Sequence, residues 1–141
     1  MATVKALLIP VGESPRPITI DGLKGLQTAV GGCVECAGWI FDDQPTVYLN
    51  DEGKYSCLPN RAVYAAAEDA GKHTWDGGTV AEGDVLDVIF GDFVAVGFDP
   101  ETGEDRDITD EEIERVMRRF GKRSDIWSGF REVMRIRAEA D

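Results

Sequence analysis

The sequence predicts an α+β fold: a small mixed or antiparallel sheet with helices packed on one face and a helical pair at the C-terminus. Its 141 residues are about one domain in length, and 43% of them are apolar, as in proteins with a buried core. Short apolar runs bounded by Gly, Pro and Asn are typical of strands, whereas a later segment has apolar residues at helical spacing behind a capping motif. We expect residues 1–121 to form a single domain, and residues 122–141 to be a helical extension packed on it or on a partner.

Five apolar runs in the first half of the chain are predicted to be strands. They are bounded by residues that break helices and form turns. The runs are Val4–Ile9, Arg16–Ile20, Cys33–Phe41, Thr46–Leu49 and Lys54–Leu58. Asn50–Gly53 separates the last two and is typical of a hairpin turn, in which the glycine supplies a positive φ.

Two helices are expected to cover this sheet. The first occupies residues 21–30, because Asp21 can cap it, apolar residues recur on one face, and Gly31 can adopt the left-handed conformation that ends a helix. The second occupies residues 61–70, between Asn60 as the cap and Gly71 as the stop.

The second half of the chain holds the predicted centre of the sheet and the clearest helix. Asp84–Asp99 is one long strand interrupted at Gly91, or two strands that meet at a bulge. Thr109 and Glu112 form a capping box, which predicts a helix over Asp110–Phe120. Burial is expected for Leu8, Ile20, Leu26, Val30, Val47, Leu49, Val85, Val88, Phe93, Val94, Ile113 and Phe120.

The C-terminal segment is predicted to be a helix over Asp125–Ala138 with a wide apolar face. Its apolar residues spread over more of the circumference than one core needs, so we expect it to join two subunits in a homo-oligomer, most simply a homodimer. The alternative is that it packs on the sheet of its own chain.

Charge sets limits on the partners of the chain. The net charge is −12, so we expect no direct nucleic-acid binding by the acidic body and no attraction to anionic membranes. Residues 1–100 hold 15 acidic residues against six basic ones, whereas residues 115–137 hold eight basic residues against two acidic ones. The basic end is either a solvated helix face or a docking surface. No apolar run could cross a bilayer, and three cysteines suit a reducing compartment, so we expect a cytoplasmic protein.

No catalytic group, metal site or cofactor is predicted. Cys33, Cys36, Cys57 and the single histidine, His73, have the composition of a zinc site, but the first two lie three apart in a predicted strand and therefore point to opposite faces. The phosphate-binding, dinucleotide-binding and zinc-protease motifs are absent from the sequence. An enzyme is therefore the less favoured interpretation.

Six stretches of the chain, taken together, resemble a known family. In order they are LIPVGESPRPITID, LQTAVGGCVE, VYLNDEGK, LPNRA, DVIFGDFVAVG and ITDEEIERVMRRF, and they extend from about Val4 to Gly121. Their order and spacing are similar to those of the small phage, mobile-element and bacterial proteins catalogued as domain of unknown function 3846. The resemblance implies a compact α+β unit encoded by phage-like or conjugative DNA, without an established activity.

The resemblance also implies a set of recurring polar positions, which we take as candidate ligand-binding residues. They are Glu35, Asn50, Glu52, Asn60, Arg61, Asp87 and Asp92. Asn50 and Glu52 have a structural explanation in the predicted turn, and Asn60 has one as the predicted helix cap. Arg61 opposes the dipole of the predicted helix, so we expect it either to pair with Glu35 or Asp87 or to hold an anionic ligand.

Two classes of function remain open from the sequence. The favoured one is a non-catalytic accessory protein of a phage or mobile element that binds a host or defence protein, either as an acidic decoy or by sequestering a ligand. The alternative is a small enzyme or metal-dependent hydrolase that uses carboxylates near Asp87 and Asp92; Asp84 lies close to both in sequence.

Overall fold

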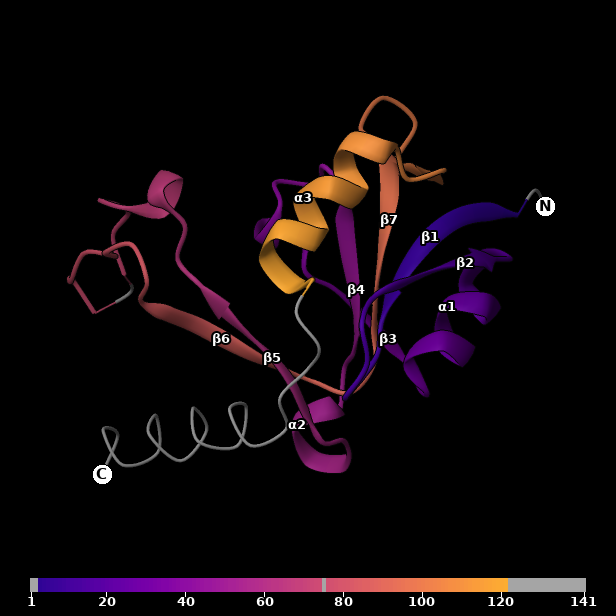
Figure 1. Ribbon diagram of the computed structural model, residues 1–141, viewed down its shortest axis with the longest axis horizontal. Coiled ribbons are helices and arrows are strands. Elements are labelled where there is room, and N and C mark those ends of the chain that lie inside the picture. Colours follow the sequence, from indigo (N-terminus) through magenta and orange to yellow (C-terminus); the bar gives the residue numbers. More distant parts are fainter. Residues whose placement is uncertain (1–2, 75, 122–141) are drawn as a thin grey trace.

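The computed structural model describes residues 3–74 and 76–121 (Figure 1). The strands are β1 (Val4–Ile9), β2 (Arg16–Ile20), β3 (Val34–Cys36), β4 (Thr46–Asn50), β5 (Pro59–Tyr64), β6 (Val85–Phe90), β7 (Phe93–Asp99) and β8 (Glu104–Arg106). The α-helices are α1 (Gly22–Val30), α2 (Gly53–Ser56) and α3 (Asp110–Phe120), and two short 3₁₀ turns are η1 (Gly38–Ile40) and η2 (Ala67–Asp69).

The larger sheet has six antiparallel strands in the order β2-β1-β7-β4-β3, with β8 also paired to β7. Ala95 of β7 lies opposite Leu7 of β1 on one side and opposite Val47 of β4 on the other. The predicted centre of the sheet is therefore confirmed for β7. The two alternatives for the sheet are decided in favour of the antiparallel one.

Both faces of this sheet are covered, because alternate residues of the central strands are apolar on each side. Val94 and Val96 of β7 face α1, and they pack in one core cluster with Leu26 and Val30. Phe93 and Ala95 belong to the larger cluster on the other face, which α3 covers. Of the two helices predicted to pack together on one face, only the one over residues 21–30 forms, as α1, and α3 covers the opposite face (Figure 1).

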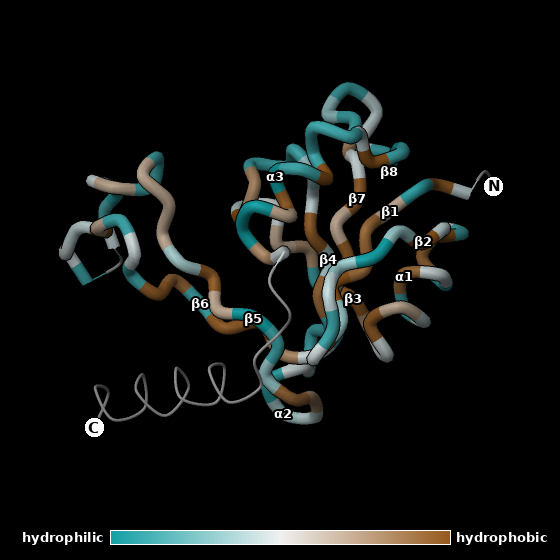
Figure 2. Tube along the Cα trace, in the orientation of Figure 1, coloured by the Kyte–Doolittle hydropathy of each residue, from teal (hydrophilic) through white to brown (hydrophobic). Residues whose placement is uncertain are grey.

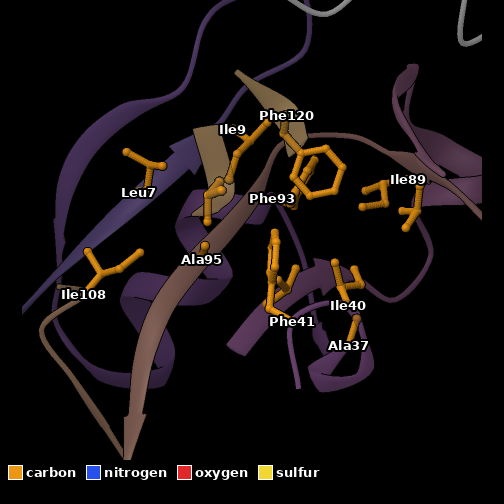
Figure 3. Close-up of a cluster of buried hydrophobic side chains, with 13 residues drawn as sticks. Leu7, Ile9, Ala37, Ile40, Phe41, Ile89, Phe93, Ala95, Ile108 and Phe120 are labelled. Carbon is orange, nitrogen blue, oxygen red and sulfur yellow. The ribbon is translucent and has the colours of Figure 1, made fainter. Parts of the chain in front are cut away.

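The larger core is centred on aromatic rings. Phe120 of α3 makes edge-on contacts with Phe41 and Phe93, with ring centroids 5.9 and 5.4 Å apart. Figure 3 shows the Phe93 and Phe120 rings between Ile9 and Ile89, with side chains from both sheets in the one cluster.

A second, two-stranded antiparallel ribbon, β5–β6, projects from the larger sheet at the start of its central strand, β7 (Figure 1). β6 and β7 are separated only by Gly91 and Asp92, yet they belong to different sheets. Gly91 has a φ of +82°, and a Cβ at this position would lie 2.9 Å from the Sγ of Cys57. The chain turns from one sheet into the other here because residue 91 has no side chain.

The predicted helix over residues 61–70 is wrong, because residues 59–64 form β5. Ala62 and Val63 pair with Val88 and Asp87 of β6, more than twenty residues away along the chain. Backbone hydrogen bonding to a distant partner and burial of Val63 outweigh the local helical preference of an alanine-rich segment.

Two predicted strands are also wrong in extent or type. The strand over 33–41 ends at Cys36, since the chain turns into η1 at Gly38. The segment 54–58 is not the second strand of a hairpin, because residues 53–56 form the short helix α2. Gly53 is needed there for close packing and not for a positive φ, since a Cβ would lie 2.6 Å from the carbonyl oxygen of Phe90.

Helices α1 and α3 are close to their predicted bounds. Gly31 ends α1 with a φ of +78°, although Asp21 makes no side-chain capping hydrogen bond. The capping box of α3 is confirmed: the Thr109 hydroxyl accepts from the Glu112 N–H, and the Glu112 carboxylate accepts from the Thr109 N–H.

Burial is confirmed for most of the predicted core. Buried residues are Leu8, Ile20, Leu26, Val30, Val47, Val88, Phe93, Val94 and Phe120, whereas Leu49, Val85 and Ile113 are half-buried.

The predicted C-terminal helix and its role in association lie outside the described residues. Within the described part of the chain, no helix is long and apolar enough to span a membrane.

Candidate functional site

The site is built on a loop of residues 38–45, which we call the display loop. Its two aspartates, Asp42 and Asp43, have φ values of +53° and +59°, a conformation that costs non-glycine residues energy and that Asp tolerates better than most. Gly38 makes room for it, because a Cβ there would lie 2.1 Å from Oδ1 of Asp43. The Gln44–Pro45 peptide bond is cis.

Arg115 of α3 holds both ends of this aspartate pair. Its Nη1 donates to the carbonyl oxygens of Phe41 at 2.8 Å and Gln44 at 2.9 Å, which flank Asp42 and Asp43 in the chain. The guanidinium also lies over the Phe41 ring, 5.4 Å from its centroid. The backbone of the display loop is thereby fixed to α3.

Arg119, one turn further along α3, extends this attachment to the ribbon. Its Nη1 donates to the Ile40 carbonyl oxygen at 2.8 Å, and its Nη2 donates to the Tyr64 carbonyl oxygen at 2.6 Å. Ion pairs of 3.5 Å join Arg115 to Glu68 and Arg119 to Asp69 on η2. The arginines that were predicted as a basic helical end therefore hold together the display loop, α3 and the ribbon.

Beside the display loop lies a cleft of about 590 Å³, which we call the acidic cleft. Its walls come from the display loop, the turn after β7, β8 and α3, and they include Asp42, Asp43, Pro100, Glu111 and Arg118. Two further arginines line it, but Arg106 is paired with Glu112 and Arg115 with the groups described above. Three carboxylates and the exposed Arg118 remain, so the cleft is negative.

The Arg106–Glu112 pair joins β8 to the first turn of α3. Nη1 and Nη2 of Arg106 donate to the two carboxylate oxygens at 2.8 and 3.2 Å. Burial on its own would raise the pKa of Glu112, but the hydrogen bonds from Arg106 and from Thr109 outweigh it and lower the pKa. The pair keeps one wall of the acidic cleft ionised.

The acidic cleft opens onto an acidic end of the molecule. Residues 99–114 contain nine acidic residues and one basic residue. The turn after β7 and the first turn of α3 lie together at the top of Figure 1 and are hydrophilic in Figure 2. Within the described residues, seven exposed carboxylates of this end have no ion-pair partner: Asp42, Glu101, Glu104, Asp107, Asp110, Glu111 and Glu114.

Residues 4–121 match the model of one family, described as Domain of unknown function (DUF3846). The chain belongs to this family. The resemblance stated from the sequence is confirmed over the range expected for it. No curated protein and no solved structure matches the chain.

The candidate residues Asn60 and Arg61 of this DUF3846 domain are both buried in β5. The Asn60 amide donates to the carbonyl oxygens of Ile9 and Gly91, both at 2.9 Å, and its oxygen accepts from Arg61. The prediction that Asn60 caps a helix is wrong. Its side chain instead joins β1, β5 and the turn between β6 and β7.

The guanidinium of Arg61 is surrounded by backbone carbonyls. It donates to those of Pro10 (3.2 Å), Glu13 (2.9 Å) and Phe120 (3.2 Å). Pairing with Glu35 or Asp87 is a wrong prediction, since Arg61 has no carboxylate partner within the described residues. Burial lowers the pKa of Arg61 to about 10, so it stays charged at neutral pH. The last residue of α3, Phe120, places this cation at a helix C-terminus, where the dipole favours it.

Asp87 and Asp92 of the DUF3846 domain do not converge. Asp87 forms an ion pair of 2.9 Å with Lys54 of α2, and Oδ1 of Asp92 accepts from the Val11 N–H at 2.9 Å. Asp92 therefore hydrogen-bonds to the loop after β1, near the contacts that Asn60 and Arg61 make with the end of β1 and with the same loop. Asp87 instead joins α2 to β6.

The remaining candidates lie around the end of β4. The Asn50 amide donates to the Val30 carbonyl oxygen at 3.1 Å, and its oxygen accepts from the Glu52 N–H. Glu52 precedes α2 without a side-chain cap, and Glu35 is exposed on β3 opposite Leu49. Asn50 thus has a structural role at the end of α1.

The four zinc-type residues of the sequence are not brought together. Cys36 contacts the Thr46 hydroxyl, Cys57 lies beside Gly91, and His73 pairs with Thr79 beyond η2. Across residues 3–74 and 76–121, no group of three or more His, Cys, Asp or Glu is placed to hold a metal ion.

Sequence reasoning missed the display loop and its arginine clamp. The available local signal was Asp42-Asp43 shortly before a proline, since Asp tolerates the left-handed region and a proline limits the residue before it. The clamp had no local signal, because Arg115 lies 74 residues beyond Phe41.

Proposed function

We propose that this DUF3846 protein is a non-catalytic accessory protein that binds a basic surface of a host or defence protein through its acidic end. The observation that carries the proposal is the rigid presentation of unpaired carboxylates around the acidic cleft. Asp42 and Asp43 are held by Arg115, and Glu111 is held on a well-capped helix. Charges fixed before binding lose little conformational entropy when a partner arrives, which favours recognition.

A decoy of nucleic acid is the form of this proposal that the charge favours. A protein that recognises DNA or RNA presents Lys and Arg to phosphates, and rigid carboxylates can occupy the same basic surface. The partner would then be a nucleic-acid-binding protein, and duplex DNA would compete with the acidic end for it.

The alternative of a metal-dependent hydrolase has no support from the positions of Asp87 and Asp92. Their carboxylates contact Lys54 and the Val11 backbone, and Asp87 lies in β6 whereas Asp92 lies in the turn between β6 and β7. We therefore propose no reaction for this protein.

The test is quantitative capture of proteins from a bacterial lysate by three immobilised chains. One is the wild type, and the second has Asp42→Asn, Glu101→Gln, Glu111→Gln and Glu114→Gln. Asn also tolerates the left-handed conformation of residue 42. The third is a control with Asp21→Asn, Glu35→Gln, Asp51→Asn and Glu82→Gln, which removes the same charge from exposed acids elsewhere.

The wild type and the control are expected to retain the same partner, and the acidic-end variant is expected to lose it by about tenfold or more. Added salt and duplex DNA should release the partner, because the contact is ionic. Equal loss from both variants would mean that only net charge matters and would contradict the proposal. Equal retention by both would contradict it as well.

A further inference from the structure

A second cleft, of about 550 Å³, lies on the opposite face of the larger sheet from α3. Its apolar walls include Val4 of β1, Ile20 of β2, Leu23 and Leu26 of α1, and Val34 of β3. Leu26 and Ile20 are buried in the core, but Leu23 is 59% exposed at the rim. We call this space the α1 cleft. Its volume suits a small organic molecule and not a protein surface.

The polar end of the α1 cleft is a half-buried pair from two strands. The Tyr48 hydroxyl of β4 donates to Oδ1 of Asp105 on β8 at 2.8 Å. These strands pair with opposite edges of β7, so the phenol reaches across the central strand to the carboxylate. The hydrogen bond fixes the orientation of Asp105 and leaves its second oxygen, Oδ2, without a hydrogen bond to any described residue.

The charge of the α1 cleft is of one sign. Glu104 and Asp105 line it, and no Lys, Arg or His is among its lining residues. Lys5, the neighbour of Val4, projects to the other face because side chains alternate along β1. A ligand that fills this cleft therefore meets apolar walls and one carboxylate end without a cation to neutralise it.

We propose that the α1 cleft binds a small organic cation with an apolar, planar body, of the arylalkylamine class. The body would lie against Leu23, Ile20 and Val34, and the ammonium group would donate to Asp105. A charge-assisted hydrogen bond to a carboxylate held by a second hydrogen bond is stronger than a neutral one. Anionic molecules of the same shape are rejected by Glu104 and Asp105. This site is separate from the acidic cleft, and it stands or falls independently of the proposed function.

The test is a titration of the ¹⁵N-labelled full chain with three probes of similar shape, in which binding is monitored through the amide chemical shifts. Tryptamine is the cation, tryptophol is the neutral control, and indole-3-acetate is the anion. Tryptamine is expected to saturate, with shifts confined to the elements that line the cleft, which are β1, β2, α1, β3, β4 and β8. Tryptophol should bind at least about tenfold more weakly than tryptamine, and indole-3-acetate should not bind.

Three variants complete the test. Asp105→Asn should weaken tryptamine by about tenfold while leaving tryptophol unchanged, because only the cation uses the carboxylate. Leu23→Ala should weaken both probes, whereas Leu58→Ala, a leucine that is also 59% exposed but lies near α2, should weaken neither. Folding of each variant is checked by its dispersed amide spectrum.

Three outcomes would overturn the inference. They are no saturable tryptamine binding at millimolar concentration, equal binding of the cation and the anion, and tryptamine binding that Asp105→Asn leaves intact. None of them bears on the acidic-end variants, whose substituted residues line no part of the α1 cleft.

Discussion

Asn60 and Arg61 are adjacent polar residues that the fold buries together in β5. Between them they satisfy the carbonyl oxygens of Ile9, Pro10, Glu13, Gly91 and Phe120. These groups belong to the loop after β1, the turn before β7 and the end of α3. Four of these carbonyls, those of Ile9, Pro10, Gly91 and Phe120, belong to buried residues, and without Asn60 and Arg61 each would lose a partner where the two sheets meet.

Asn60→Ala is therefore expected to destabilise the protein by about 2–4 kcal/mol. The substitution removes two hydrogen bonds to buried carbonyls and leaves Arg61 without its side-chain acceptor. Urea unfolding measures the change. Asn50→Ala is the matched control, because its amide makes one such bond in a half-buried position, and it should cost about 1 kcal/mol. Equal costs for the two variants would contradict this view of Asn60.

At the scale of elements, α3 connects the parts of the molecule through charged side chains. Arg106 of β8 holds its first turn through Glu112, and Arg115 and Arg119 hold the display loop and the ribbon. The Glu112 side chain is 9% exposed and the Arg106 side chain is 42% exposed, so solvent weakens the ion pair only in part.

Glu112→Gln is expected to lower the free energy of unfolding by about 1–2 kcal/mol at neutral pH. The pKa of Glu112 in the folded protein lies below its ordinary value of 4.5, so its stabilising effect is fully present above about pH 4.5. The effect is lost as the pH falls through the lower folded-state value. Unfolding in urea at several pH values between about 7 and 3 should show the two chains converging in acid. A gap that is constant over this range would contradict the prediction.

The elements that the sequence predicted correctly are those with local signals. The capping box and stripe of α3 lie within one segment, and β1, β2 and β4 are apolar runs between turns. The ribbon was missed because β5 depends on β6 for its hydrogen bonds, and residues 61–70 read alone favour a helix. The contacts of Asn60 and Arg61 were missed for the same reason, since both bond to carbonyls that only the folded chain brings near.

At the scale of the whole molecule, Gly91 decides how the two sheets are joined. β6 ends and β7 begins on either side of it, and side chains from both sheets meet in the larger core. The ribbon is attached to the body by this turn, by Asn60 and Arg61, and by the ion pairs of α3 with η2.

Gly91→Ala is expected to destabilise the protein by about 2 kcal/mol or more. The positive φ is unfavourable for alanine, and the alanine Cβ would lie 2.9 Å from the Sγ of Cys57. Gly103→Ala is the control, since it has a similar φ of +74° but open space around the added carbon. Thermal unfolding should show the larger loss for Gly91→Ala, and equal losses would mean that the contact with Cys57 is unimportant.

The order of strands in the larger sheet leaves β2 and β3 at its two edges. β3 is three residues long, and β2 contains Pro17, which has no N–H to offer an incoming strand. Short edge strands and edge prolines keep sheets from pairing edge to edge and growing into aggregates. Two copies of the larger sheet are therefore poorly suited to join through β2 or β3 into one continuous sheet.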